Sequence, residues 1–122
     1  MDIPNRRGIF ARASAPDGAA PGLRVSPLPR RAGVRAAGEV SLATRAIWQR
    51  ALDQAVSAGE DVYRLELSAV TFVDVAGVDV LADAARRLAP GRRIVLARPP
   101  AAVPRMLELF WPGLTGIEVS PS

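Results

Sequence analysis

Residues 62–97 read VYRLELSAVTFVDVAGVDVLADAARRLAPGRRIVLA and decide the fold of this chain. Apolar and polar residues alternate over residues 62–67, which predicts a strand with one buried face. Apolar side chains then recur every three to four positions as far as Ala89, which predicts a helix, and Pro90-Gly91 ends it. The short apolar run 94–97 reads as a second, more buried strand. A strand, a helix and a second strand in this order predict a parallel pair joined by a right-handed crossover.

The turn that opens the helix is the most distinctive local feature. Residues 71–73 lead into Asp74, Val75, Ala76 and Gly77. An Asp just before a helix accepts hydrogen bonds from the unpaired amides of the first turn. A Gly permits close approach of another segment of the chain. Taken alone, this spacing is also that of an ordinary strand-to-helix turn.

The rest of the chain extends the alternating pattern in both directions. Ser41 stands at the position of a helix N-cap, after two strands that read as a hairpin. The additional elements are predicted over residues 23–26, 34–39, 42–58, 104–110 and 117–119. The order β-β-α-β-α-β-α-β predicts an α/β protein with a mostly parallel central sheet of about five strands flanked by helices.

Residues 1–22 differ from residues 23–122 in composition and charge. They are rich in Arg, Ala, Pro and Gly without a sustained period, so we expect a disordered basic tail followed by one domain. Residues 1–35 hold seven Arg against two Asp, a net charge of +5, whereas residues 36–122 hold nine Arg against ten acidic residues. We therefore assign the basic character to the N-terminal segment rather than to the folded body, and expect no direct nucleic-acid binding.

The composition excludes most of the common catalytic residues. The chain has no Cys, no His and no Lys, which removes thiolate chemistry, the usual general base near neutral pH and Schiff-base formation. We expect a protein that is not an enzyme and needs no cofactor or metal. No apolar run approaches the length of about 20 residues that a membrane span requires, and no signal-peptide core follows the first arginines. A cytoplasmic protein is the expectation.

Two acidic and two tryptophan side chains each have a functional and a structural interpretation; for Trp48 and Trp111 the functional one is the wall of a ligand pocket. Asp79 and Asp83 share a helix face and could hold a hard cation, but Arg87 follows Asp83 at the spacing of a helical ion pair, and we favour that reading. Trp48 continues an apolar stripe and is expected in the core. Trp111, beside a Pro-Gly stop, is expected to lie partly exposed.

Residues 65–100 resemble the STAS domain, the family named for sulfate transporters and anti-sigma factor antagonists. Leu65-Glu66-Leu67-Ser68 stands where the family has a D-L-S-like strand ending, and residues 74–77 stand where it has a D-x-[S/T]-G turn. The segment GEVSLAT (38–44) resembles the family's first helix start, and AAVPRMLELFWPGL (101–114) resembles its third helix. The resemblance covers about residues 23–120 and implies the STAS fold.

The resemblance implies a regulatory, non-catalytic module that docks an anti-sigma factor or a serine kinase-type partner. Antagonists of the family carry a phosphorylatable Ser or Thr in the D-x-[S/T]-G turn, whereas Val75 and Ala76 lack a hydroxyl. Ser41 stands where the family has an Asp in its first loop. A phosphate would add a charge of about −2 at a helix start. Its absence implies partner binding that phosphorylation at this turn does not control.

The candidate partner-binding residues are Ser41, Asp74, Val75, Ala76, Gly77 and Val80. At about 100° per residue, Val80 lies nearly opposite the inward-facing Val78. We therefore expect Val75, Val80 and Ala84 to form an exposed apolar patch. Two alternatives stay open: a small-ligand or nucleotide sensor, because helix amides after Asp74 favour anions, and an accessory subunit of a lipid or anion transporter.

Overall fold

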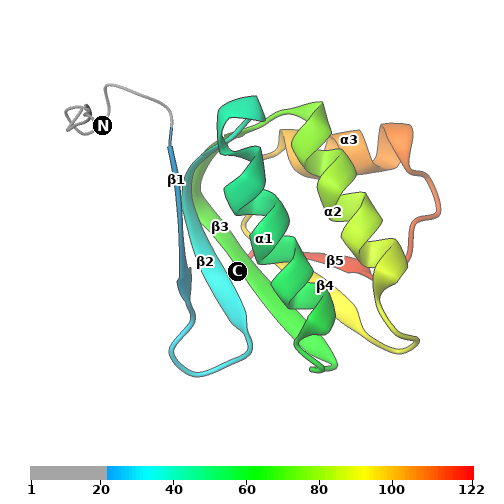
Figure 1. Cartoon of the computed structure of the whole chain (residues 1–122). Coiled ribbons are helices and arrows are strands. Elements are labelled where there is room, and N and C mark those ends of the chain that lie inside the picture. Colours follow the sequence, from blue (N-terminus) through cyan, green and yellow to red (C-terminus); the bar gives the residue numbers. More distant parts are fainter. Residues whose placement is uncertain (1–21) are drawn as a thin grey trace.

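Five strands form one sheet in the order in which they occur along the chain (Figure 1). The computed structural model describes residues 22–122, so the expectation of a disordered tail lies almost wholly outside the described residues. The strands are β1 (Leu23–Pro27), β2 (Gly33–Val40), β3 (Val62–Val73), β4 (Arg93–Ala97) and β5 (Ile117–Ser120). The β1–β2 pair is an antiparallel hairpin and the other three pairs are parallel. The predicted element order and the mostly parallel sheet are confirmed.

The helices cover one face of this sheet. They are a short 3₁₀ helix η1 (Leu42–Thr44), α1 (Arg45–Ser57), α2 (Val75–Arg87) and α3 (Ala102–Phe110). Each parallel connection moves one strand along the sheet in the same direction. Because such crossovers are right-handed, α1, α2 and α3 all lie on the same side, as the view from the helix side in Figure 1 shows for α1 and α2. No helix of residues 22–122 covers the opposite face.

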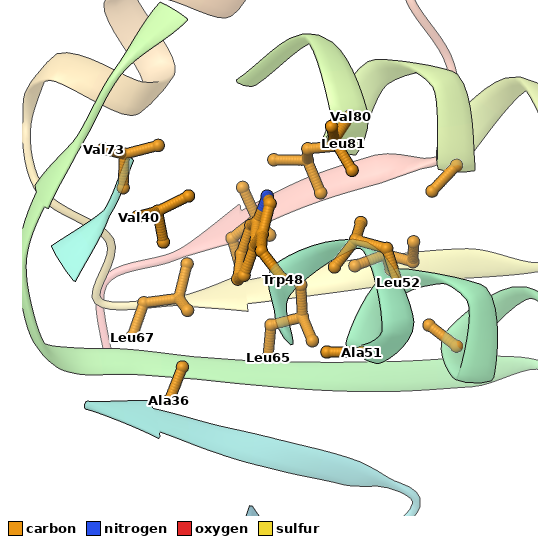
Figure 2. Close-up of a cluster of buried hydrophobic side chains, with 14 of the residues drawn as sticks. Ala36, Val40, Trp48, Ala51, Leu52, Leu65, Leu67, Val73, Val80 and Leu81 are labelled. Atoms are coloured by element: carbon orange, nitrogen blue, oxygen red, sulfur yellow. The ribbon is translucent and has the colours of Figure 1, made fainter. Parts of the chain in front are cut away.

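The core lies between the sheet and the α1–α2 pair (Figure 2). Trp48 of α1 is 2% exposed and packs among apolar side chains of β2, β3 and α2. Its predicted place in the core is confirmed. Trp111 is half-buried at the end of α3, as expected.

Strand β3 is longer than the sequence pattern indicates. The alternation over residues 62–67 predicts a strand that ends at Leu67, but residues 68–70 continue the strand through two register shifts against β2. Each shift places one extra residue in β3, so the inward and outward positions exchange phase. This is why the alternation breaks at Ser68 although the strand does not. The consequence is that β3 reaches Val73 and delivers the next residue, Asp74, to the edge of the sheet.

The helix bounds differ from expectation at their ends. The first helix begins as a 3₁₀ turn, and α2 begins at Val75, so that Gly77 lies inside its first turn. Arg92 donates to the carbonyls of Ala55 (3.1 Å) and Val56 (2.7 Å), which satisfies acceptors at the end of α1.

In the described part of the chain, no helix combines the length and the apolar character that crossing a membrane requires.

Candidate functional site

The predicted site residues meet where two neighbouring parallel strands end. Ser41 follows β2 and Asp74 follows β3, and the paired ends Val40 and Val73 lie side by side in the register. The Asp74 amide donates to the Val40 carbonyl at 3.1 Å, which links the two loops directly. Because parallel strands present their carboxyl ends at one edge of the sheet, residues 33 positions apart in sequence are brought together.

Asp74 caps helix α2, as the sequence predicts. Its carboxylate Oδ1 accepts from the Gly77 amide at 2.8 Å, and its backbone is extended. A carboxylate at this position also interacts favourably with the positive end of the helix dipole. The Asp74 side chain therefore fixes the conformation of the turn that starts α2.

Gly77 is buried and makes its contacts with other residues of this chain. Its carbonyl accepts from Trp48 Nε1 at 2.9 Å, which ties α1 to the first turn of α2. A Cβ at this position would lie 2.6 Å from Cγ1 of Val40 and 3.1 Å from Cγ1 of Val73. The requirement for Gly is thus close packing against the ends of β2 and β3, and Gly77 is not available to a partner.

Hydrogen bonds of the Thr44 side chain fix the conformation of the Ser41 loop. Ser41 is the extended N-cap of η1, which confirms its predicted position. The buried Thr44 hydroxyl donates to the Glu39 carbonyl at 2.8 Å and accepts from the Ser41 amide at 3.0 Å. The sequence analysis did not single out Thr44, although a Thr three residues after an N-cap Ser is a recognisable sign of reciprocal capping.

Two exposed apolar side chains flank the joined loops. Leu42 is 81% exposed and Val75 is 51% exposed, and Ala76 beside Val75 is also exposed. Leu42 and Ala76 line one small hollow with Ser41 and Asp74. We call Leu42, Val75 and Ala76 the apolar patch. Leu42 was missed in the sequence, yet its signal is present, since it follows the cap directly and lies off the apolar stripe of α1.

The prediction that Val80 is exposed is wrong. Val80 is 3% exposed and Ala84 is fully buried, so neither belongs to an outer patch. Figure 2 shows Val80 in the cluster around Trp48. The side of α2 that carries Val80 and Ala84 faces α1, because α1 packs along the flank of α2 while the sheet covers a second side. The prediction from 100° per residue assumed that the helix has one buried side, whereas α2 has two.

Of the acidic pair on α2, Asp83 is engaged in an ion pair. Arg87 lies 3.1 Å from Asp83 and 3.0 Å from Asp53 of α1, which confirms the predicted helical pair and adds a bridge between the helices. Within residues 22–122 no group of three or more acidic side chains is placed to hold a metal ion. The start of α2 is also poorly suited to an anion, because the Asp74 carboxylate already accepts from Gly77 N there.

One buried carboxylate lies on the helix-free face of the sheet. Glu66 accepts from the Ser68 amide at 2.8 Å and from the Arg98 guanidinium at 2.9 Å. Burial acts to raise the pKa of Glu66, but these hydrogen bonds and the charge of Arg98 hold it at about 2. The Ser68 amide belongs to the first register shift of β3, so Glu66 satisfies a group that the sheet leaves without its regular partner.

A second concavity lies between α3 and β5. It is a groove of about 640 Å³, and its apolar lining includes Leu107, Trp111, Leu114, Ile117 and Val119. Its volume is in the range of small-molecule sites, although it is open to solvent. None of the predicted site residues contributes to it.

Comparison with known proteins identifies the family. The family model described as "Mlab, STAS domain" matches residues 23–115. No curated protein sequence matches the chain. A solved anti-sigma factor antagonist from Mycobacterium paratuberculosis has a similar structure, with a TM-score of 0.69 at 19% identity over 83% of this chain and 87% of that one.

A second solved structure, the anti-sigma factor antagonist SpoIIAA in its unphosphorylated form, is similar with a TM-score of 0.60 at 16% identity. This likeness covers 83% of the present chain and 89% of SpoIIAA. At such identities the likeness concerns the fold. Together with the family match over residues 23–115, it establishes that the chain belongs to the STAS domain family.

Proposed function

We propose that this STAS domain is a non-catalytic regulatory module that docks a protein partner of the anti-sigma factor or serine kinase type. The contact surface is the apolar patch together with Ser41 and Asp74. The observation that supports the proposal is the exposure of Leu42 and Val75 beside a turn that Asp74 holds in place. Apolar side chains held on a rigid scaffold bind without the entropy cost of ordering a loop.

The revised surface differs from the one that the sequence predicts. Val80 and Gly77 are buried and are left out, whereas Leu42 is added. Arg45 lines the hollow next to Leu42 and is exposed, so a charged group borders the apolar side chains. An apolar centre with a polar rim is the usual composition of a protein interface.

Photo-crosslinking tests the surface. A benzoylphenylalanine is placed at position 42 or 75 of the full chain and, as a control, at position 109, where Leu109 of α3 has an exposed fraction between those of Leu42 and Val75. We expect positions 42 and 75, but not 109, to capture a protein with the ATPase fold of anti-sigma kinases. Capture of such a protein from position 109 alone would contradict the proposal.

Affinity measurements with the captured partner give a quantitative test. Leu42→Asp and Val75→Asp should each weaken binding about tenfold, since each replaces buried apolar area at the interface by a charge. Leu109→Asp should change the affinity less than twofold. Equal losses in all three variants would indicate a nonspecific effect of added negative charge and would count against the apolar patch.

The absent hydroxyl predicts binding that phosphorylation at this turn does not regulate. With the partner and ATP, residues 74–78 of the natural chain should gain no phosphate, because none of their side chains is a Ser, Thr or Tyr hydroxyl. Ala76→Ser should create an acceptor at an exposed position. If this variant is phosphorylated and loses binding, the natural chain is a permanently receptive form of the switch. Binding by the natural chain that still depends on ATP turnover would contradict this.

A second candidate function is sensing of a small apolar ligand in the groove between α3 and β5. The groove's volume and the presence of Trp111 in its wall favour it. Ligand entry should change the fluorescence of Trp111 in a Trp48→Phe background and raise the melting temperature. The nucleotide form of this alternative has no support from the start of α2, where Asp74 places a carboxylate.

A further inference from the structure

Much of the chain's positive charge lies on the folded body, not in the N-terminal tail. Residues 22–35 contain Arg24, Arg30, Arg31 and Arg35 and no acidic residue. All four arginines are exposed and belong to the β1–β2 hairpin. This corrects the expectation that the folded domain lacks a basic patch, because the hairpin carries four of the seven arginines of residues 1–35.

Arg24 and Arg35 lie on the face of the sheet that no described helix covers. Leu23 and Val34 belong to the core, so their neighbours along the strands point to the opposite face. In the register, Arg24 is opposite Ala37 and Ser26 is opposite Arg35. The two arginines are therefore diagonal neighbours, with Cβ atoms about 7 Å apart.

The acid expected to neutralise Arg35 is engaged elsewhere. Glu66 is the residue directly opposite Arg35 in the β2–β3 pair. Both of its carboxylate oxygens are already in use, one by the Ser68 amide and the other by Arg98. Among residues 22–122, neither Arg24 nor Arg35 forms an ion pair. Two like charges at this separation repel each other, and an anion bound between them would relieve the repulsion.

The same hairpin provides a free strand edge. Within the described sheet, β1 pairs only with β2, so one row of its backbone amides and carbonyls has no partner strand. An extended peptide can add to such an edge by backbone hydrogen bonds, while its alternate side chains reach the arginine face. A nucleic acid cannot pair with a strand edge. Phe72 is the one large aromatic exposed on this face among the described residues, so a base-stacking platform is lacking.

We propose that the β1–β2 hairpin is a second docking site, which binds an acidic extended segment of a partner protein along β1 with its carboxylates on Arg24 and Arg35. Guanidinium groups bind carboxylates through paired, charge-assisted hydrogen bonds. This site is distinct from the apolar patch, since it lies on the outer strand and on the opposite face of the sheet.

Binding of a labelled peptide to the full chain tests the proposal. The probe is a fluorescein-labelled peptide of alternating Glu and Val, and its control replaces each Glu by Lys. Fluorescence anisotropy at low ionic strength should detect the Glu peptide alone. The variant Arg24→Gln/Arg35→Gln should weaken binding about tenfold or more, because charge-assisted hydrogen bonds are lost.

The matched control is Arg50→Gln/Arg105→Gln, which removes the same charge from exposed positions on α1 and α3. This control should change the affinity less than twofold, and circular dichroism should show that both double variants are folded. Equal weakening by the two double variants would overturn the proposal in favour of a general charge effect. So would absence of binding by the natural chain.

Two further probes separate an acidic protein segment from other anions. An oligothymidylate and vesicles containing phosphatidylserine are tested with the same variants. Tighter binding of either probe than of the Glu peptide, lost on changing Arg24 and Arg35, would assign the site to nucleic acid or membrane and overturn the proposal. Preference for the Glu peptide, with new hydrogen-exchange protection in β1, supports it.

Discussion

At the scale of single residues, Gly77 and Trp48 decide how α2 sits on the molecule. The absence of a Cβ at Gly77 lets the first turn of α2 approach the buried Val40 within van der Waals contact. The indole of Trp48 then donates to the carbonyl of the same residue. One glycine therefore links both strand ends and both helices that form the candidate site.

Gly77→Ala should destabilise the fold by about 1 to 3 kcal/mol, because the added methyl overlaps the rigid side chain of Val40. This cost exceeds the gain in helix propensity that Ala brings. Urea denaturation measures the change in the free energy of unfolding. Gly22→Ala is the control, since a Cβ there meets no atom within 4 Å. A Gly77→Ala variant as stable as the natural protein would disprove the packing account.

Glu66 should make the stability depend on acid pH. Its pKa is lowered from 4.5 to about 2 in the folded state, so its contribution is complete above the unfolded pKa near 4.5. That contribution disappears as the pH falls from there through about 2. It is on the order of 2–3 kcal/mol. In Glu66→Gln, urea denaturation at a series of pH values should show a flatter dependence in this window. An unchanged slope would mean that other carboxylates cause the acid loss.

At the scale of the elements, α2 is buried on two sides and, beyond its first turn, exposes only a narrow polar strip. The strip carries Asp79, Asp83 and the two arginines of its last turn. One side of the helix meets the sheet, and the side with Val80 meets α1. What remains accessible for a partner at the start of α2 is its first turn, where Val75 and Ala76 lie.

The contrast between Val80 and Val75 follows from this packing. Val80→Ala should lower the free energy of unfolding by about 1 to 3 kcal/mol, because it leaves a cavity between α1 and α2. Val75→Ala should change it by less than about 0.5 kcal/mol. Thermal and urea unfolding of the two variants provide the comparison. Similar losses for both would show that Val75 also packs inside the molecule.

At the scale of the whole molecule, helices cover one face of the sheet and leave the other open. The apolar patch lies at the edge where β2 and β3 end, and the basic hairpin contains the outer strand β1, with Arg24 and Arg35 on the open face. The two surfaces share no residue. They should therefore bind independently.

Independence predicts additive effects. Leu42→Asp should weaken binding of the regulatory partner and leave the affinity for the Glu peptide unchanged. Arg24→Gln/Arg35→Gln should weaken binding of the Glu peptide and leave the affinity for the regulatory partner unchanged. In the combined variant the two losses should equal those measured separately, as expected for sites without shared contacts. Isothermal titration of both ligands checks this. Mutual dependence of the two affinities would show that the surfaces are coupled or form one interface.

The sequence predicts local features of this protein well. The alternation in strands, the apolar period of α2 and the cap at Asp74 depend on near neighbours in the chain, and each appears as expected. The break at Ser68 was misread, because a register shift depends on the partner strand β2. Leu42 was not among the predicted site residues, although the sequence already shows that it lies off the apolar stripe of α1.

The sequence by itself determined the element order, the STAS family and the missing hydroxyl at the turn, since these depend on residue identity and short-range periodicity. Only the tertiary structure decided that Val80 is buried and that Arg24 and Arg35 lie on an open face. The physical reason is that burial depends on how many neighbours an element packs against. Crossover handedness and strand order set that number through contacts between residues far apart in the chain.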